Sequence, residues 1–507
     1  MELLNSILTW VMKKRIHQIE LFMKYPFDVQ EEVFKKLIVT AQNTQWGRQY
    51  RYSDIKSIKD FQERVPVSSY EQIFPYIDRT IKGEANLLWP SETKWFAKSS
   101  GTTNSRSKFI PVSFEALNEC HYKGGKDMLS IFVNNNPETK IFAGKSLAIG
   151  GSNQVNSFND NSNSYYGDVS AVIMKNLPFW AQFIRTPSLE IALMENWEEK
   201  LEKISSSTIN ENVTNIAGVP TWTLVLLKRI LEITGKKNIQ EVWPNLELFV
   251  HGAVSFAPYK EEFKRLIPSG SMKYLETYNA SEGFFGIQDT SDGDDMLLML
   301  DYGIFYEFIP MEDFESENPK TLLLSEVEVG KNYAMVISTN GGLWRYKIGD
   351  TVKFTSTNPF RIKISGRTKH YINAFGEEVI IENAEAAITK ACKETGAIVV
   401  NFTAAPVYMS EGKRGGHEWI IEFSNTPDNL NYFIKVLDQT LREINSDYDA
   451  KRHKDLALVA PIVHAVAEGT FYNWMKRRGK LGGQNKVPRL SNNREYIDDI
   501  LGMVLAV

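Results

Sequence analysis

The chain has 507 residues, which is too long for one ordinary domain and predicts about three folding units at roughly 150 residues each. Hydrophobic residues make up 43% and charged residues 24% of the sequence, the balance of a globular protein whose core needs neither disulfides nor a metal. The 58 Lys and Arg against 62 Asp and Glu give a net charge of −4, which excludes a dedicated nucleic-acid-binding protein.

The N-terminal part of the chain is predicted to be helical. An apolar stretch, Leu3–Met12, is followed rather than preceded by basic residues, which is not the order of a secretory signal. We expect an amphipathic helix that packs on the protein, with a helix on a membrane surface as the alternative. Apolar residues then recur every three or four positions in Val29–Ala41. The sequence contains no apolar run of about 18 residues, so we expect no membrane-spanning segment and no membrane partner.

The middle of the chain alternates strands and helices. The segment Gly150–Asp168 is rich in Asn and Ser, which favours a loop because these side chains compete for backbone hydrogen bonds. Thr214–Val219 and Leu246–Val250 are predicted to be buried strands, with a helix at Trp222–Ile233 between them. This order predicts parallel pairing and an α/β layer.

The last 210 residues or so are predicted to form strands and then a small α+β domain. The strands are Met296–Phe308, Thr321–Val329, Ala334–Thr339 and Val352–Phe354. The small domain is expected to contain a helix, two strands and a second helix: Ile380–Glu394, Ala397–Thr403, Glu418–Phe423 and Leu430–Ile444. Polar residues near Arg367 suit a hinge, so we predict two functional parts, residues 1–367 and residues 368–507.

The first segment with chemical content is a turn rich in hydroxyl groups. Small residues around a glycine let backbone amides converge on an anion, and Lys108 adds a point charge before the chain resumes as a strand. A triphosphate loop and a Ser/Thr-rich hairpin turn both fit this composition. The glycine and lysine spacing of a GxxxxGK[ST] loop is absent. The turn residues are Ser99, Ser100, Gly101, Thr102 and Thr103.

A second segment, Tyr274–Gly286, passes from apolar residues to small polar ones and then to Glu282. A carboxylate that leaves a strand beside a phosphate loop is well placed to hold Mg²⁺, which prefers oxygen ligands. An ordinary solvated loop acid is the alternative. Just upstream, the small residues Gly252 and Ala253 end a strand and would let a flat ring approach the backbone. We assign no catalytic role to His251.

Three further segments follow. Asp350 comes after a glycine in Trp344–Val352, and on a tight turn it would accept two hydrogen bonds from a ribose diol; a plain hairpin turn is the alternative. The polar residues of Ile364–Glu377, at the predicted domain boundary, suit a hinge. In Lys476–Arg489, glycines among cations indicate a mobile basic loop that either reaches a phosphate or is a solvated surface tail.

These segments, together and in this order, resemble the adenylate-forming superfamily of acyl-CoA ligases, luciferases and nonribosomal adenylation domains. The closer resemblance is to the auxin-responsive acyl-acid amido synthetases (the Gretchen Hagen family) and to their bacterial branch. It extends from about Asn43 to Arg494. It implies an α/β adenylate-forming fold, with a large N-terminal domain of α/β subdomains and a small mobile α+β C-terminal domain.

The resemblance also implies roles for individual residues. Ser99 to Thr103 look like the phosphate loop, and Lys108 occupies its basic position. Gly252 and Ala253 match the residues that border adenine. Asp350 matches the ribose ligand, Arg367 the hinge arginine, Glu282 the Mg²⁺ ligand and Lys486 the swinging cation. The motif beside adenine is matched by Thr277, Tyr278, Asn279, Ala280 and Ser281.

Three departures from the family pattern stand out. Asn104 and Ser105 lie where a glycine is common, and Lys347 lies where arginine is usual; lysine cannot make the same two-pronged contacts. Lys480 is a second candidate for the swinging cation, but the neighbours of Lys486 match the family better.

The resemblance implies a two-step reaction. A carboxylic acid attacks ATP to give an acyl-adenylate and pyrophosphate, and an amine, expected to be an amino acid, then displaces AMP to form an amide. Val219, Trp222 and Tyr122 are expected to bind the acyl group, the last from a loop near His121; a place in the hydrophobic core is the alternative for Trp222. An acyl-CoA ligase and a non-catalytic nucleotide-binding protein are the alternatives.

The cysteine content agrees with this chemistry. Cys120 and Cys392 are the only cysteines, which excludes a disulfide framework or a Cys-rich zinc site and favours the cytoplasm. A reaction without a covalent enzyme intermediate needs no thiol nucleophile. We expect a monomer or a weak homo-oligomer.

Overall fold

The computed structural model describes residues 9–99, 108–150, 156–158, 163–177, 183–194, 196–253, 256, 259–291, 293–314, 316, 318–367, 371–409, 414–455, 457–478 and 487–505. Most of the predicted helix Leu3–Met12 therefore lies outside the described residues. So do four residues of the expected phosphate loop, Ser100 to Thr103, and both candidate lysines, Lys480 and Lys486.

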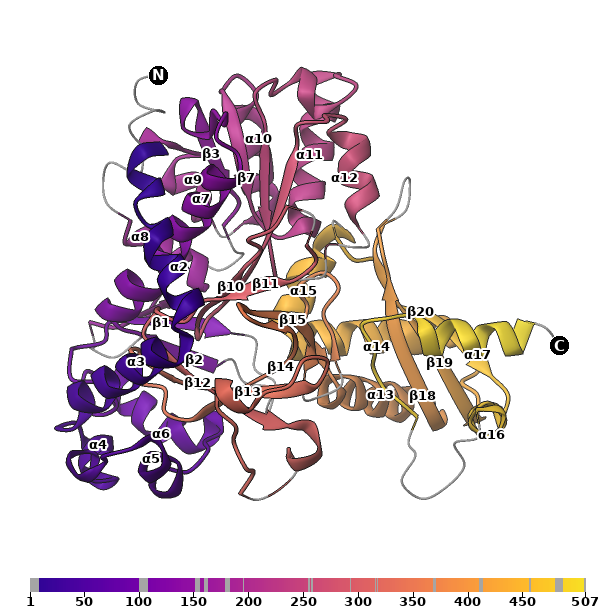
Figure 1. Ribbon diagram of the computed structural model, residues 1–507. Helices are drawn as coiled ribbons and strands as arrows, with labels where there is room; N and C mark the ends of the chain where they lie inside the picture. The colour runs from indigo at the N-terminus through magenta and orange to yellow at the C-terminus, as the bar shows by residue number, and fades with distance from the viewer. Residues whose placement is uncertain are drawn as a thin grey trace.

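The prediction of an N-terminal helical region is confirmed. α3 begins with a proline in the first turn, where the missing amide costs nothing. It buries Phe34, Leu37, Ile38 and Ala41 on one face, as the spacing predicts. These helices cover one side of the molecule (Figure 1) and comprise α2 (Ile16–Lys24), α3 (Pro26–Ala41), α4 (Gln45–Gln49), α5 (Ile58–Arg64) and α6 (Tyr70–Ile81).

Within the described residues, eleven strands form one central sheet in the order β12-β13-β14-β15-β11-β10-β9-β8-β7-β3-β6. The β9 to β6 end is parallel, whereas the pairs from β9 to β12 are antiparallel. The strands are β3 (Lys145–Ala148), β6 (Arg185–Thr186), β7 (Val213–Ala217), β8 (Leu248–His251), β9 (Lys273–Ala280), β10 (Gly283–Ile287), β11 (Met296–Leu298), β12 (Ile304–Pro310), β13 (Asn332–Thr339), β14 (Tyr346–Thr357) and β15 (Phe360–Arg367).

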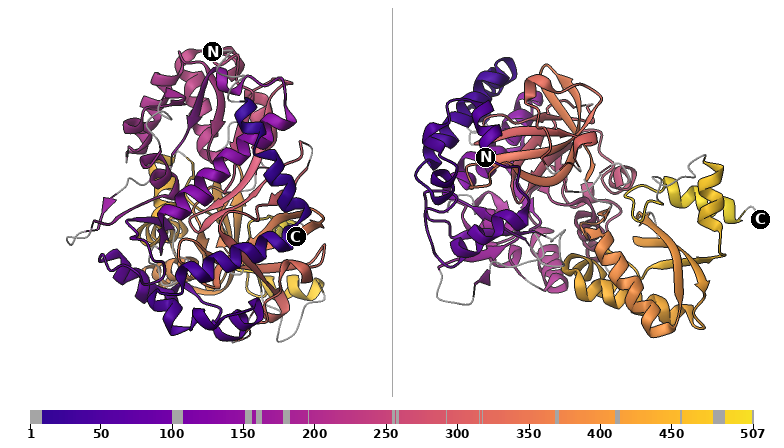
Figure 2. Two further views of the ribbon diagram at one scale, coloured as in Figure 1. Left: turned by 60° about the vertical axis from the view of Figure 1, so that its left-hand side comes forward. Right: turned by 90° about the horizontal axis from the view of Figure 1, so that it is seen from below.

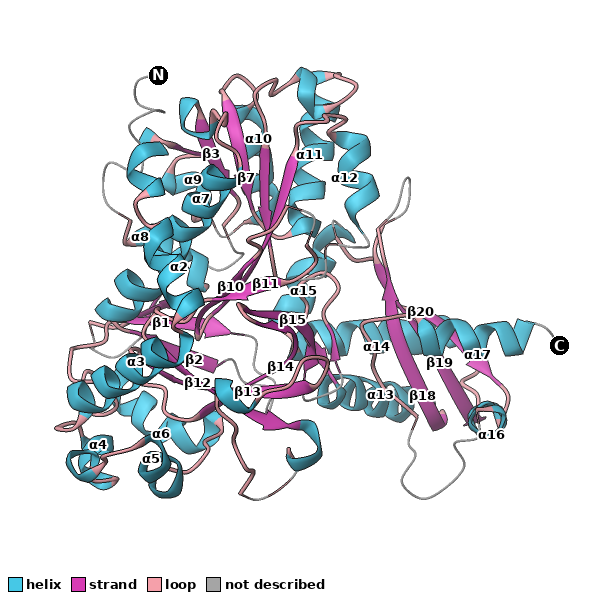
Figure 3. Cartoon of the chain, in the orientation of Figure 1, coloured by secondary structure: helices cyan, strands magenta, loops and turns pink. Residues whose placement is uncertain are grey.

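Helices pack on the parallel end of this sheet (Figure 3). Because α11 follows β7 and leads to β8, it is the crossover that parallel pairing requires, and the predicted α/β layer is confirmed. The helices of this part of the chain are α7 (Lys123–Asn135), α8 (Val169–Lys175), α9 (Leu189–Ala192), α10 (Trp197–Thr208), α11 (Pro220–Thr234) and α12 (Lys260–Leu266). Of these, α8 packs on the smaller sheet described next.

A second, smaller sheet contains the strands that come before and after the hydroxyl-rich segment in the sequence. Its order among the described residues is β2-β1-β5-β4. β1 and β2 pair antiparallel, so Ser99 lies opposite Lys108. The strands are β1 (Trp95–Ser99), β2 (Lys108–Val112), β4 (Asn156–Ser157) and β5 (Tyr165–Gly167).

The C-terminal part is a separate α+β body, called the cap below, at the right of Figure 1. The predicted order of helix, two strands and helix is confirmed, and α14 has the predicted bounds. Its elements are β16 (Tyr371–Ile372), β17 (Val379–Ile380), α13 (Ile381–Thr395), β18 (Ile398–Val407), β19 (Gly416–Asn425), α14 (Leu430–Ile444), α15 (Ser446–Arg452), β20 (Ile462–Val466), α16 (Thr470–Arg477) and α17 (Glu495–Leu505).

Three sequence predictions about local structure are wrong. Met296–Phe308 is not one strand, because it contains β11 and most of β12 with residues 299–303 between them. Thr321–Val329 is not a strand: the Glu326 carboxylate accepts a hydrogen bond from the Leu323 amide at 2.8 Å and closes a short 3₁₀ turn, Leu324–Glu326. Gly150–Asp168 is not wholly a loop, because it contains β4 and β5. β5 pairs parallel with β1, a partner that local composition does not reveal.

Two predicted site residues also have a different local setting. His121 and Tyr122 end a π-helical segment, Ala116–Tyr122, rather than lying in a loop; such segments are frequent at functional sites. Asp350 is not on a tight hairpin turn. It lies inside β14, after Gly349, whose φ of +94° interrupts the strand without ending it.

The cap packs against the parallel end of the large body (Figure 2). The Tyr259 hydroxyl, next to α12, donates a hydrogen bond of 2.6 Å to the Ala374 carbonyl of the cap. The Lys451 ammonium lies 4.8 Å from the centre of the Trp222 ring, and Lys454 pairs with Glu198. Among the residues that the structure describes, no helix is long and apolar enough to cross a membrane.

Candidate functional site

The aromatic motif and the ribose motif meet in the structure. The Tyr278 hydroxyl on β9 donates a hydrogen bond of 2.6 Å to Asp350 on β14, although 72 positions separate them. Asp350 also lies opposite Arg367 in the β14–β15 pairing, which places the backbone of the expected hinge beside it. Three of the sequence segments therefore converge at one point of the central sheet.

The expected basic residue is buried close by. Lys108 is 9% exposed, and its ammonium lies 3.4 Å from the Tyr346 hydroxyl and 5.5 Å from the centre of the Tyr70 ring. The Tyr70 hydroxyl accepts a hydrogen bond of 2.8 Å from the Phe109 amide. These contacts fix β2, and with it one end of the hydroxyl-rich turn, against the strand that carries Asp350.

Glu282 belongs to the same neighbourhood. Ala280 pairs with Gly283, so Ser281 and Glu282 form a two-residue turn between β9 and β10. Burial raises the pKa of the Tyr70 phenol to about 12, and the negative charge of Glu282 adds to that shift. Glu282 therefore lies within electrostatic range of Tyr70, over whose ring the Lys108 ammonium lies.

The end of β8 is shaped for close approach. A Cβ atom on Gly252 would lie 2.4 Å from the Thr277 carbonyl oxygen, so only glycine lets this strand end lie against β9. The Thr277 hydroxyl donates a hydrogen bond of 3.2 Å to the His251 carbonyl. Ala253 has a φ of +69°, a strained value for a residue with a Cβ. The small residues therefore bring the end of β8 against β9, next to the motif that contains Tyr278.

The residues also fit a magnesium ion held together with phosphates. Among the described residues, no three His, Cys, Asp or Glu side chains cluster into an all-protein metal site. Mg²⁺ commonly binds one or two carboxylates together with substrate phosphates and water. A single half-buried carboxylate, Glu282, at the turn beside Lys108 is the donor set that such binding needs.

The three residues expected to bind the acyl group are not brought together. Trp222 is 7% exposed and lies under the Lys451 ammonium of the cap, in a core cluster that Val219 also contacts. Tyr122 packs on a different core cluster, and its hydroxyl donates to the Ile173 carbonyl at 3.2 Å. Trp222 therefore packs the large body against the cap, whatever else it contacts.

A cleft of about 740 Å³ lies between β8, β9 and the cap. It includes Ala253 and Thr277 of the predicted nucleotide site. It also includes His251, whose ring stacks on Phe256 at 4.1 Å and whose pKa is lowered to about 3, first by burial and then by Lys260.

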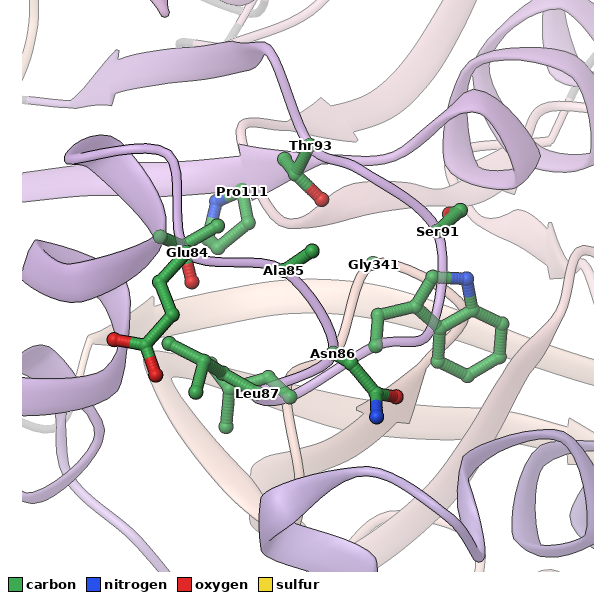
Figure 4. Close-up of a pocket in the computed structure, with 11 residues that line it drawn as sticks. Glu84, Ala85, Asn86, Leu87, Ser91, Thr93, Pro111 and Gly341 are labelled. Carbon is green, nitrogen blue, oxygen red and sulfur yellow. The ribbon is translucent and has the colours of Figure 1, made fainter. Parts of the chain in front are cut away.

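A second cavity, shown in Figure 4, is unsuited to a substrate. Its volume is about 10 Å³, room for roughly one water molecule. The side chains of Glu84, Thr93 and Pro111 surround it (Figure 4). We assign it no role in binding.

Sequence reasoning missed one ion pair that holds the site. The Arg345 guanidinium donates to both carboxylate oxygens of Glu307, each at 2.9 Å, and these side chains are 4% and 1% exposed. Arg345 directly precedes Tyr346, the contact of Lys108. Arg345 belongs to the Trp344–Val352 motif, but no local pattern indicates its partner on β12.

Replacing Asp350 with asparagine should raise the KM for ATP by about tenfold or more, since a hydrogen bond to a charged group is worth about 1.5–3 kcal/mol. Tyr278→Phe is the matched control: it removes the internal hydrogen bond but leaves the carboxylate, and we expect a smaller change. The measurement is pyrophosphate exchange at varied ATP. An unchanged KM in the Asp350 variant would remove this carboxylate from the nucleotide site.

Family models match most of the chain. The GH3 family N-terminal domain matches residues 15–272, the central domain residues 297–367 and the C-terminal domain residues 382–495. This chain belongs to the GH3 family. The prediction from the sequence motifs is confirmed at this level.

Curated relatives of the GH3 family cover nearly the whole chain. Indole-3-acetic acid-amido synthetase GH3.3 of Arabidopsis thaliana is 22% identical, over 91% of this chain and 89% of its own. The 4-substituted benzoates-glutamate ligase GH3.12 of the same plant is 23% identical, over 91% and 92%. Jasmonoyl-L-amino acid synthetase JAR4 of Nicotiana attenuata is 23% identical, over 94% and 92%. These are plant proteins, so the bacterial branch stays a prediction.

Solved structures confirm the adenylate-forming fold. GH3.15 acyl acid amido synthetase has a TM-score of 0.61 at 17% identity and covers 96% of this chain and 95% of its own. A 2-hydroxyisobutyryl-CoA ligase has a TM-score of 0.56 at 13% identity, over 95% and 92%. The GH3 fold has the large N-terminal and smaller C-terminal domain that the sequence predicts.

Proposed function

We propose that this GH3-family protein uses ATP to activate a carboxylic acid as an acyl-adenylate and then joins the acyl group to the amine of an amino acid. The products are an amide, AMP and pyrophosphate. The observation that carries the proposal is the contact of Tyr278 with Asp350, because it assembles two nucleotide motifs of one family at a single place. The relatives named above, which are amido synthetases and ligases, support amide formation.

The first step asks little covalent chemistry of the protein, so positioning and charge neutralisation carry the rate. Asp350 would accept hydrogen bonds from the ribose diol, and the bare backbone at Gly252 and Ala253 would border the purine. Lys108, with the amides and hydroxyls of Ser99 to Thr103, would hold the phosphates. Glu282 would hold Mg²⁺, which supplies charge neutralisation to the phosphates when bound.

We further propose that the chain works as two domains, residues 1–367 and 368–507, and that the cap turns about Arg367 between the two steps. Support comes from the position of Arg367, whose backbone ends β15 opposite Asp350. Under this proposal, a nucleotide bound at Asp350 would lie beside the hinge. We also propose a cytoplasmic monomer or weak homo-oligomer, in keeping with the two unpaired cysteines.

The proposal is tested by exchange of labelled pyrophosphate into ATP with Mg²⁺ and a panel of carboxylic acids. We expect exchange that depends on the acid. If none of the acids in a wide panel supports exchange, that result would contradict activation of a carboxylate and would favour a non-catalytic nucleotide-binding protein.

The candidate swinging cation gives a second prediction. The residues after Lys486 are held on β18, because the Thr403 hydroxyl donates to the Pro488 carbonyl at 2.6 Å and the Ala404 amide to the Arg489 carbonyl at 2.9 Å. In the sequence, Lys486 comes shortly before this anchor, whereas Lys480 comes six residues earlier. Lys486→Ala should lower adenylation by about a hundredfold, the loss expected of one aimed cationic donor.

Lys480→Ala is the matched control for that variant and should lower adenylation much less. Both are compared by the initial rate of pyrophosphate release. The opposite ranking would transfer the role to Lys480.

A further inference from the structure

The cleft between the parallel strands and the cap is open enough for a second substrate. Its volume is about 740 Å³, and its walls come from β8, β9, β15 and the cap. Asn373, Tyr408 and Asn492 line it from the cap side. The view from below in Figure 2 shows the cap beside the large body at this junction. The cleft is therefore complete only while the cap is packed as described.

Two buried polar groups face this cleft without a partner among the described residues. His251 is 4% exposed, and its Nδ1 atom makes no hydrogen bond. The Tyr274 hydroxyl on the neighbouring strand is also buried and unpaired. Most buried polar groups in proteins are hydrogen-bonded, and leaving one unpaired costs about 1–3 kcal/mol. A ligand that pairs both groups accounts for their position.

The charge around these two groups selects an anion. Lys260 lies near enough to His251 to help lower its pKa, the larger cause being burial, so the imidazole is neutral near pH 7 and offers one N–H. Burial, with a smaller effect of Glu261, raises the pKa of Tyr274 to about 12, so the phenol keeps its proton and donates. An ammonium and two neutral donors suit a carboxylate, which only accepts hydrogen bonds.

An acidic side chain that could bind a cation, Glu276, lies two residues further along β9. Glu276 is on the same face of the strand as Tyr274, about 7 Å away, and it lines the same cleft. Burial and then Asp294 raise its pKa, while Lys363 opposes that shift. Lys363 is itself paired with Asp294 at 2.5 Å. The Glu276 carboxylate thus provides an acceptor that suits an ammonium group.

Building on the proposed function, we propose that this cleft binds the acceptor amino acid as a zwitterion, with its α-carboxylate between Tyr274 and Lys260 beside His251. Glu276 receives the ammonium group. Tyr274, Lys260 and Glu276 line one cleft, so a small molecule that carries both a carboxylate and an ammonium group can meet a partner for each. A primary amine that lacks the carboxylate is accordingly a poor acceptor.

The test separates the two half-reactions. Tyr274→Phe keeps the ring and its packing, and Lys260→Met keeps most of the apolar stem. Each is assayed for amide formation with the best of the common amino acids at varied concentration, and for acid-dependent pyrophosphate exchange without acceptor. Lys264→Met is the matched control, because Lys264 lies on the same helix but pairs with the exposed Glu261 at 2.8 Å.

We expect both cleft variants to raise the KM for the amino acid by about tenfold or more, as for one lost hydrogen bond to a charged group. Exchange and melting temperature should match the wild type. The wild type should strongly prefer the amino acid to the corresponding amine without a carboxylate, and the variants should lose that preference.

Three results would overturn the acceptor site: an unchanged KM for the amino acid, a raised KM for ATP in its place, or equal use of the amine by the wild type. Wild-type exchange that does not depend on an acid would refute the proposed function itself. That outcome is seen before any acceptor is added, so the two failures are distinguishable.

Discussion

Glu282→Ala should reduce acid-dependent pyrophosphate release by about a thousandfold. A metal ion on a transferring phosphoryl group is worth several kcal/mol of charge stabilisation, and each factor of ten corresponds to about 1.4 kcal/mol. Glu282 is the carboxylate at the β9–β10 turn. Its negative charge contributes to the raised pKa of Tyr70, and the Lys108 ammonium lies over the Tyr70 ring. Removal of this carboxylate leaves the Lys108 side of the site without its expected metal ligand.

The matched control for that variant is Glu63→Ala on α5. Its carboxylate is 66% exposed and lies 3.8 Å from Lys59, far from a buried role, so we expect wild-type release. The assay is initial pyrophosphate release at saturating ATP and acid, repeated over a range of Mg²⁺ concentrations. Full activity of Glu282→Ala with an unchanged Mg²⁺ requirement would remove this residue from the metal site.

Arg345→Met should lower the free energy of unfolding by about 3–5 kcal/mol, the cost of leaving one partner of a buried ion pair uncompensated. Arg345 and Glu307 are almost fully buried. The guanidinium also donates to the Val65 carbonyl at 2.6 Å and to the Thr321 hydroxyl at 2.7 Å. The variant therefore loosens the join between α5, β12 and the start of β14.

Urea unfolding of three variants tests this prediction. Arg345→Met with Glu307→Leu should be more stable than Arg345→Met alone, because the double change removes the stranded charge. Arg229→Met, which breaks exposed ion pairs with Glu202 and Glu232, should leave the midpoint unchanged. Equal midpoints for Arg345→Met and the wild type would show that the pair does not stabilise this region.

The elements that the sequence predicted well are those with strong local signals. The helix at Leu430–Ile444 has the predicted bounds because one apolar face repeats along it. The strands around α11 were recognisable as short apolar runs on either side of a helix. These signals depend on neighbouring residues only, so a single sequence contains them.

The predictions that failed depended on distant partners or on backbone geometry. Gly349 was expected to form a turn, but its positive φ interrupts a continuing strand; a glycine followed by an aspartate looks alike in both cases. Thr321–Val329 has strand-like composition, yet a single Glu326 side chain closes a turn there.

In the candidate site, too, local motifs identify individual residues, whereas contacts between distant residues cannot be predicted from the sequence. Asp350 and Tyr278 were both found as members of motifs, but their hydrogen bond spans 72 positions and no local pattern predicts it. The Arg345–Glu307 pair depends on tertiary packing alone, and so do the groups of His251 and Tyr274 that have no partner within the described part of the chain. The motifs therefore predict a nucleotide as the ligand, and the structure shows how the residues of those motifs are arranged.

The central claim, amide formation through an acyl-adenylate, is tested most directly by the mass of the product. The protein is incubated with ATP, Mg²⁺ and a panel of carboxylic acids, with amino acids or CoA as acceptor. We predict a product with the mass of acid plus amino acid less one water, with AMP formed in equal amount. A thioester formed only with CoA, and no amide with any amino acid, would contradict the account.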